Sequence, residues 1–283
     1  ATTYAAQFGL YAQDEWKPTR NFTLTYGVRM DIPVLLNKPT ENEAFNNSEL
    51  SAATGEKVGT TPKATPLFSP RVGFRWWIDD NHKILLRGGA GLFTGRVPFV
   101  WLSNAYNNTG MEAKSVQINN PASDFPHTSD PYNDIIKTGI ASAGGKATIN
   151  TLNRNFKYPQ VFRASLGYDH DFGHGWKLTL DALYSKNINN VFFTNMAITP
   201  TAKAYGVNAA VAESNPNSVA SSYTITKDYS AVVALQNTDK GYSYSLSAML
   251  NKHFNFGLDL MASYTFGHSY SVNDGSSSVA MSN

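Results

Sequence analysis

Strict alternation of apolar and polar residues is the feature that most constrains how this chain folds. Over residues 22–31, Phe22, Leu24, Tyr26, Val28 and Met30 alternate with threonine, glycine, arginine and aspartate. Successive side chains of a β-strand point to opposite faces, so this segment has one apolar and one polar face. The same period recurs over 6–16, 71–78, 83–94, 162–169, 176–185, 242–251 and 258–267. The sequence therefore predicts an all-β, antiparallel up-and-down fold with about eight long strands, neighbours in sequence order.

The connections between these segments are of two kinds. Four are short and contain residues that favour turns: Pro18–Asn21, Asp79–His82, Gly173–Gly175 and Asn255–Gly257. Three are long and polar, at about 32–68, 95–158 and 187–240, and within them 131–141 and 201–213 could form short helices. Short turns at one end and long loops at the other are typical of a transmembrane β-barrel of the Gram-negative outer membrane, whose long loops are extracellular. Such a sheet must close on itself, because lipid leaves no hydrogen-bond partner for a bare strand edge.

The composition agrees with a sheet that does not face water everywhere. Charged residues make up 16% of the chain, against roughly 25% in ordinary soluble domains. A formal net charge of +2 argues against a nucleic-acid partner. No run of about 18 apolar residues predicts a transmembrane helix, and no signal peptide opens the chain, so a chain exported across the inner membrane would here be a processed piece or a fragment. Aromatic residues adjoin the turns, either as a girdle at the lipid boundary or as cross-strand pairs of a soluble sheet: Trp16, Phe22, Trp76, Trp77, Trp176, Phe254 and Phe256.

Several segments resemble a known family. The sequences of Leu10–Lys17, Ser69–Phe74 and Arg87–Gly91 look like barrel strands of TonB-dependent outer-membrane transporters. The segment GRVPFVWLSN at Gly95–Asn104 resembles the Oar-like branch common in Bacteroidetes. Two further segments add to the resemblance, which extends over most of the chain: Leu235–Tyr244 and Ser276–Asn283.

The resemblance implies a 22-stranded barrel filled by an N-terminal plug domain. Such proteins take up a ligand with energy delivered by an inner-membrane protein through a short N-terminal box. Residues 1–283 have too few strands for that barrel, and neither the plug nor the box, so they look like part of one transmembrane β-barrel domain, cut in outer loops on both sides. We therefore expect Tyr4–Trp16 and Gly257–Tyr270 to be edge strands that pair with missing strands of the intact barrel.

The polar faces carry five arginines, which would point into the barrel lumen if the apolar faces meet lipid: Arg29, Arg71, Arg75, Arg87 and Arg163. Two interpretations are open. The arginines pair with Asp31, Asp169, Asp181 and the plug, which we favour, or they contact an unknown anionic ligand.

Other chemistry finds little support in the sequence. His170 and His174 are four residues apart, but the strand-and-turn context separates such a pair, so we expect no metal site. Gly88, Gly89 and Gly91 lack the strand, turn and helix of a dinucleotide site, and close backbone packing is the simpler role. No catalytic triad or nucleophile elbow stands out. We expect no catalytic residues, no cofactor and no enzyme activity.

Three classes of function remain. The first is ligand uptake by an energised outer-membrane transporter. The second is an adhesin or structural barrel without active transport. The third is a soluble β-sandwich that binds carbohydrate. Detergent dependence separates the third class from the other two, and a plug with an N-terminal box in the parent protein separates the first from the second.

Overall fold

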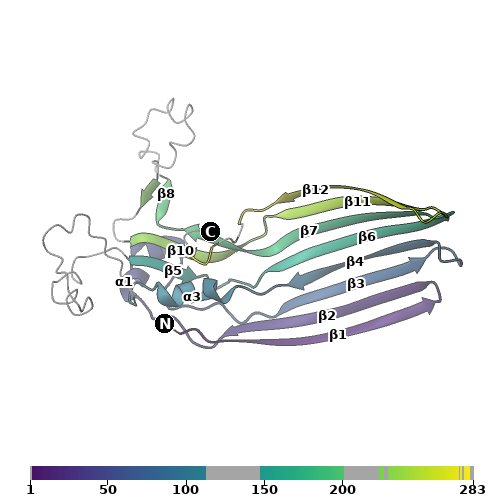
Figure 1. The fold of residues 1–283 in the computed structure, drawn as a ribbon. Coiled ribbons are helices and arrows are strands. Elements are labelled where there is room, and N and C mark those ends of the chain that lie inside the picture. The colour runs from purple at the N-terminus through teal and green to yellow at the C-terminus, as the bar shows by residue number, and fades with distance from the viewer. Residues whose placement is uncertain are drawn as a thin grey trace, which may run out of the picture.

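Eight long strands form one antiparallel sheet whose order follows the sequence (Figure 1). The computed structural model describes residues 2–112, 147–200, 223–225, 229–273, 275 and 277–280. The sheet runs β1 (Ala5–Thr19), β2 (Phe22–Leu35), β3 (Leu67–Trp77), β4 (Ile84–Thr94), β6 (Gln160–Gly173), β7 (Trp176–Asn195), β11 (Tyr242–His253) and β12 (Asp259–Tyr270). The predicted all-β fold, its eight long strands and their order are confirmed.

The four short turns lie where the sequence predicts them, all at one end of the sheet. In the turn before β7, Gly173 and Gly175 have φ of +79° and +81°, and His174 between them has φ of +51°. A side chain at position 175 would meet the carbonyl oxygen of His253, so glycine is required there. In the turn before β4, the Asp79 carboxylate accepts the backbone N–H groups of Lys83 and Ile84 at 2.9 and 2.7 Å. Desolvation acts to raise the pKa of Asp79, but these N–H groups outweigh it and hold the pKa below its usual range.

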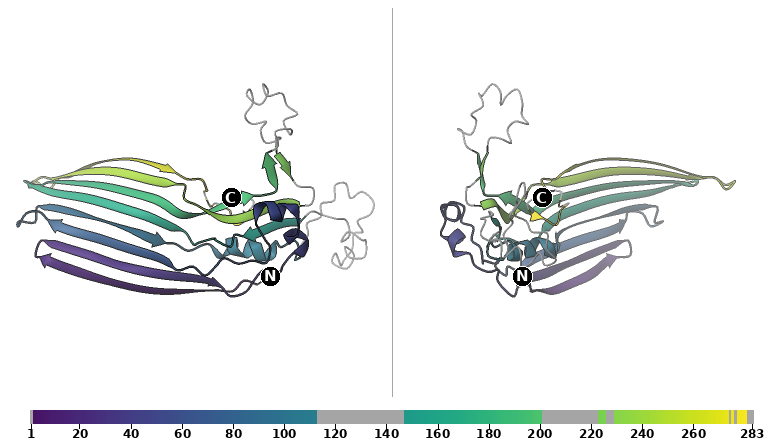
Figure 2. Two further views of the ribbon diagram at one scale, coloured as in Figure 1. Left: turned by 180° about the vertical axis from the view of Figure 1, so that it is seen from behind. Right: turned by 60° about the vertical axis from the view of Figure 1, so that its left-hand side comes forward.

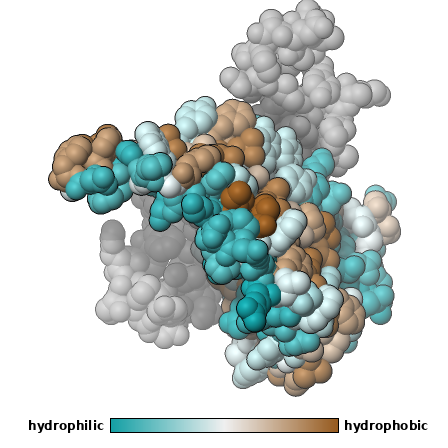
Figure 3. Space-filling model, turned by 90° about the vertical axis from the view of Figure 1, so that its right-hand side faces the viewer, coloured by the Kyte–Doolittle hydropathy of each residue, from teal (hydrophilic) through white to brown (hydrophobic). Residues whose placement is uncertain are grey.

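The register keeps the two faces of every strand apart. Thr25, Gly73, Gly89, Ser165 and Leu183 lie opposite one another in one row across β2, β3, β4, β6 and β7. The next row, on the other face, is almost wholly apolar: Leu24, Phe74, Gly88, Leu166, Ala182, Leu246 and Phe266. Seen from the turn end, the sheet is an arc (Figure 3), which is the shape of a partial barrel wall.

Both expected edge strands are edges of this sheet. Leu10 in β1 pairs with Met30 of β2, and Leu260 in β12 pairs with Lys252 of β11. Within the described residues, β1 and β12 each pair with a single strand, and no ladder joins them. Among the described residues the sheet is therefore open, and its outermost N–H and C=O groups have no partner strand there.

The described parts of the long loops form a folded lobe at the other end of the sheet (Figures 1 and 2). It contains α1 (Glu43–Asn46), α2 (Glu49–Thr54), α3 (Phe99–Asn107), β5 (Ala147–Leu152) and β10 (Tyr229–Thr238). A short hairpin of β8 (Ile198–Pro200) and β9 (Tyr223–Ile225) adjoins it. The end of β7 pairs with β10, and β10 pairs with β5 in parallel. The expectation of antiparallel pairing throughout is therefore wrong for this pair, because β5 and β10 come from different loops and are not joined by a hairpin.

The lobe has two hydrophobic clusters of its own. Its fully buried side chains include Phe45, Leu102, Tyr106, Ile149 and Val232. The helices that the sequence predicts at 131–141 and 201–213 lie outside the described residues, and α1, α2 and α3 were not predicted. No helix in the described ranges has both the length and the apolar character needed to cross a membrane.

One buried carboxylate joins three loops inside this lobe. Glu56, in the β2–β3 loop, is 2% exposed. It accepts hydrogen bonds from Thr151 Oγ1 at 2.9 Å and Asn153 Nδ2 at 2.7 Å in the β4–β6 loop, and from Gln236 Nε2 at 3.3 Å in β10. In addition, the Tyr106 hydroxyl donates to the carbonyl oxygen of Asn37 at 2.6 Å, and burial raises the pKa of this tyrosine. The loops are thus held together by specific polar contacts as well as by apolar packing.

Candidate functional site

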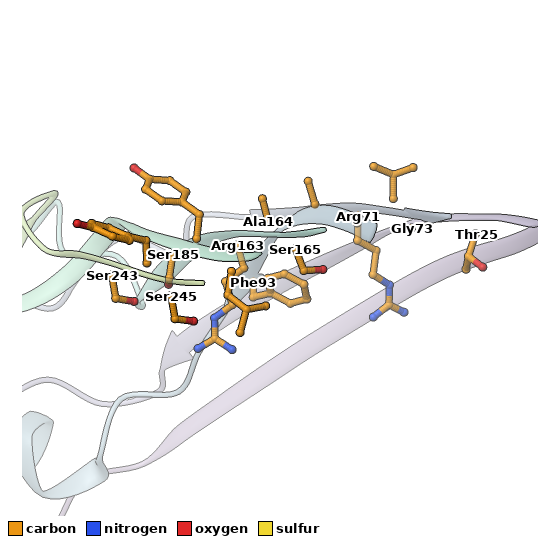
Figure 4. Close-up of a pocket in the computed structure, with 16 residues that line it drawn as sticks. Thr25, Arg71, Gly73, Phe93, Arg163, Ala164, Ser165, Ser185, Ser243 and Ser245 are labelled. Atoms are coloured by element: carbon orange, nitrogen blue, oxygen red, sulfur yellow. The ribbon is translucent and has the colours of Figure 1, made fainter. Parts of the chain in front are cut away.

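The polar, concave face of the sheet bounds a hollow of about 640 Å³ in the half of the strands nearer the lobe. Its polar side chains project from the same side of the sheet, while Ala164 points to the opposite side (Figure 4). They come from β2, β3, β6, β7 and β11, and Phe93 of β4 joins them: Thr25, Arg71, Arg163, Ser165, Ser185, Ser243 and Ser245. The hollow is thus lined by small hydroxyl side chains, two arginines and the Phe93 ring, together with Leu183, Tyr184, Tyr244 and smaller apolar residues of the same strands.

The two arginines of the hollow belong to one row of the sheet. Gly91 of β4 pairs with Arg71 of β3 on one side and with Arg163 of β6 on the other. Alternate strands are about 10 Å apart, and the glycine between them puts no side chain in the way. Arg71 donates to Gln13 Oε1 at 2.5 Å. In the described part of the chain, neither arginine has a carboxylate within 4.0 Å, so both positive charges are available to another molecule or domain.

Arg87 is held by two aspartates of the same face. Its Nε lies 2.9 Å from Asp169 Oδ2 and its Nη2 lies 2.9 Å from Asp181 Oδ1. Gly167 makes this possible, because a Cβ at that position would lie 2.6 Å from Arg87 Cζ. The guanidinium group therefore crosses strand β6 over a glycine to reach Asp181 in β7.

Arg29 follows the same principle at the lobe end of β2. It forms a two-pronged ion pair with Asp31, with Nε–Oδ2 and Nη2–Oδ1 distances of 2.7 and 2.8 Å. Asp31 is 2% exposed and also accepts from Gln7 Nε2 at 2.9 Å. A Cβ at Gly9 would lie 2.8 Å from Arg29 Nη2, so glycine again makes room for a guanidinium group. The pairing interpretation therefore holds for Arg29 and Arg87.

The fifth predicted arginine lies directly opposite Arg87 across the β3–β4 ladder, but outside the hollow. Arg75 is near the turn end, with its guanidinium carbon 5.2 Å from the centre of the Trp77 ring. The register therefore puts all five arginines on the polar face but brings only Arg71 and Arg163 into the hollow. Sequence reasoning missed Phe93 and Gln13. Phe93 is in phase with Arg87, Gly89 and Gly91, so the period of that strand could have identified it.

The remaining sequence candidates have structural surroundings. The Tyr168 hydroxyl is hydrogen-bonded to His170 Nδ1 at 2.8 Å, and the His170 ring stacks on Phe172. His174 lies in its turn with positive φ. Within the ranges that the structure describes, no group of three histidine, aspartate or glutamate side chains could hold a metal ion. A Cβ at Gly88 would lie 3.0 Å from the Phe74 ring, so this glycine allows close packing between strands.

Comparison with solved structures shows which folds this sheet resembles. The ferric enterobactin receptor of Pseudomonas aeruginosa in complex with BCV-L6 aligns with a TM-score of 0.51 at 14% identity, covering 93% of this chain and 27% of the receptor. The outer membrane transporter YddB of Escherichia coli aligns with a TM-score of 0.50 at 14% identity, covering 94% and 25%. The chain thus spans about a quarter of the length of these proteins. At this identity the likeness concerns the fold alone.

Comparison of sequences gives the family. No curated protein matches the chain. The family described as outer membrane beta barrel domain matches over residues 1–283. The long strands of the chain, its short turns at one end of the sheet and its polar concave face agree with that assignment. This chain therefore belongs to the outer membrane beta-barrel domain family and is located in the outer membrane of a Gram-negative bacterium.

Proposed function

We propose that this chain forms part of the barrel wall of a TonB-dependent outer-membrane transporter, rather than of an enzyme. The observation that carries the proposal is the concave face: a hollow of about 640 Å³ lined by hydroxyl groups, with Arg71 and Arg163 left without a carboxylate partner among the described residues. Arg71 and Arg163 are both exposed on the concave face, so both charges can reach a molecule or domain that enters the lumen. Such charges are useful where something else fills the lumen.

The proposal includes the rest of the protein. Residues 1–283 would be one part of a single barrel domain of 22 strands, with the missing strands pairing to β1 and β12. A plug domain would fill the lumen, and an inner-membrane protein would supply energy through an N-terminal box. Arg71 and Arg163 would bind carboxylates of the plug or an anionic ligand on its way past it. The proposal keeps the Oar-like branch of Bacteroidetes, which the segment Gly95–Asn104 resembles in sequence.

A second function is favoured by the lobe. Three loops share a hydrophobic cluster that includes Phe45, Ile149 and Val232, and they share one buried carboxylate, Glu56, so the described part of the lobe has a fixed shape. A fixed outer surface suits an adhesin or structural barrel that binds other surfaces without transport. The two functions differ in whether energy from the inner membrane is needed.

The test uses the full-length parent protein in its own bacterium. Three strains are compared: a deletion, the deletion complemented with the intact gene, and the deletion complemented with a gene lacking the N-terminal box. Removal of small molecules from the medium is followed by mass spectrometry. A transporter requires that some compound is consumed only by the strain with the intact gene. If binding of the bacterium to surfaces depends on the gene but consumption of every compound is independent of it, the adhesin function is correct and the transport function is wrong.

Variants then test the site. Arg71→Gln combined with Arg163→Gln should slow consumption of the same compound, with expression and heat-resistant folding unchanged. Arg75→Gln is the matched control, since it removes an arginine from the same face outside the hollow. Equal effects of the control and the double variant would contradict a role for the hollow.

A further inference from the structure

A lysine interrupts the apolar face of β11 near the turn end. Along that face the strand reads Tyr242, Tyr244, Leu246, Ala248 and Leu250, and the next position is Lys252. Its neighbours across the sheet are apolar as well, Trp176 in β7 and Leu260 in β12. The turns of an outer-membrane barrel lie on the periplasmic side. Lys252 is therefore on the lipid-facing surface, at the level of the periplasmic boundary of the membrane.

Aromatic rings surround the ammonium group of Lys252. Its Nζ lies 5.0 Å from the centre of the Trp176 ring and 5.0 Å from the centre of the Phe254 ring. Nζ also donates a hydrogen bond to the backbone carbonyl oxygen of His174. An ammonium group has three donors, so contacts with this carbonyl leave donors for a further acceptor. Two rings and a carbonyl hold the charge in one place instead of leaving it on a freely moving side chain.

The charge of Lys252 is not neutralised on its own face. Across the described residues it forms no ion pair within 4.0 Å. Lys177, which follows Trp176 and lies on the opposite face, does have a carboxylate partner, with Nζ 3.7 Å from Asp171 Oδ2. His170 lies on the same face, two strands away, and its ring is hydrogen-bonded to the Tyr168 hydroxyl and stacks on Phe172. The positive charge of Lys252 is therefore available to an anionic group of the membrane lipids.

An apolar groove lies on the same face, further into the membrane. It has a volume of about 410 Å³, and two alanines, Ala182 and Ala248, form its base. Larger side chains of β4, β6, β7, β11 and β12 form its walls: Leu86, Leu166, Tyr168, Leu180, Leu246 and Tyr264. Ala248 is four residues before Lys252 in β11, which is about 13 Å along the strand. Leu250, 39% exposed, lies between them.

We propose that this surface is a binding site for a phospholipid of the periplasmic leaflet. The phosphodiester binds the ammonium group of Lys252, and one acyl chain passes Leu250 into the groove over Ala182 and Ala248. A diacyl phospholipid matches this arrangement, because its phosphate group meets the positive charge at the boundary and its acyl chain meets the apolar groove further into the membrane. Lipid chains touch the whole outer surface of a barrel, so the fixed charge is what distinguishes this site. The inference needs only the outer-membrane location and is independent of the proposed transport.

The test measures lipid retention by the full-length protein in mild detergent. The protein is titrated with phosphatidylglycerol or with a diacylglycerol of the same chains, and native mass spectrometry counts the bound lipid. The protein should retain at least one molecule of phosphatidylglycerol, and it should retain no diacylglycerol. Lys252→Gln should weaken binding about tenfold, a ratio that corresponds to about 1.4 kcal/mol.

Two further variants separate the parts of the site. Lys177→Gln makes the same chemical change one residue from Trp176 but on the lumenal face, and it should leave lipid binding unchanged. Ala248→Phe fills the groove while Lys252 stays intact, and it should also weaken phosphatidylglycerol binding. The proposal is wrong if Lys252→Gln and Lys177→Gln bind lipid equally, or if diacylglycerol is retained as well as phosphatidylglycerol.

Discussion

Exchanging a leucine on the lipid side for arginine tests the assignment of the two faces most directly. Leu246 is 53% exposed on the apolar face, opposite Ala182 and Phe266. It is four residues from Tyr242 and six from Lys252, the polar-tipped residues that mark the two boundaries on β11. With about 3.3 Å per residue and a tilt of about 40°, Leu246 is about 10 Å below one boundary and about 15 Å above the other. It therefore lies close to the midplane, where Leu246→Arg should destabilise the barrel by about 2–4 kcal/mol.

The neighbouring residue is the control, because it has the same depth and the opposite face. Ser247 Oγ lies 2.9 Å from Thr265 Oγ1, and Ser247 pairs with Asp181 across the ladder. Ser247→Arg would put the new charge in the lumen near that carboxylate, so its cost should stay within about 1 kcal/mol. Reversible urea unfolding of the intact barrel in lipid vesicles, followed by tryptophan fluorescence, measures both. Equal losses for the two variants, or a larger loss for Ser247→Arg, would refute the assignment of the faces.

Three other predictions follow from single contacts. Gly167→Ala should displace the Arg87 guanidinium group and cost about 1–2 kcal/mol, since each half-exposed ion pair contributes up to about 1 kcal/mol; in an Arg87→Ala background a double-mutant cycle should show almost no further loss, and an undiminished loss would contradict the contact. Glu56→Ala should leave buried donors unpaired and lower the local stability of the lobe by about 2–4 kcal/mol, seen as faster hydrogen exchange in β5 and β10, whereas unchanged exchange would exclude this role. The fold holds the pKa of Asp79 low, so this carboxylate should stabilise the protein fully above its unfolded pKa of about 4. That contribution is lost as the pH falls through the folded pKa, so the difference in unfolding free energy between wild type and Asp79→Asn should shrink towards pH ~3. A difference that does not change with pH would show that the charge is not involved.

The sheet could be predicted from the sequence because its pattern is local. Each strand in lipid must have an apolar residue at every second position, so the segment from Phe22 to Met30 can be recognised as a strand without knowledge of its neighbours. The pattern stops where the strands leave the apolar band. It therefore gave no sign that β7 continues through Asn187, Asn189 and Asn190 to Asn195 and enters the lobe. Within the described residues, the pattern located all eight long strands and misjudged only where they end.

The lobe could not be predicted in the same way, because its contacts are not local. Ala231–Leu235 is a continuous buried run, which is a recognisable signal for an interior strand. Its parallel partner, Ala147–Leu152, lies in a different loop, and no turn joins the two. Alternation put all five arginines on one face, but finding that Arg71 and Arg163 flank Gly91 needs the register of three strands.

The shared core of the lobe has a consequence for how this protein can evolve. Surface loops of independent strands can lengthen, shorten or change sequence one at a time. Here Glu56 contacts residues of two other loops, and Phe45 packs with Ile149 and Val232, so a change in one loop alters the surroundings of the other two. Among relatives that keep this lobe, insertions and substitutions in the three loops should occur as matched sets, and exchange of a single loop between relatives should fail where exchange of all three succeeds.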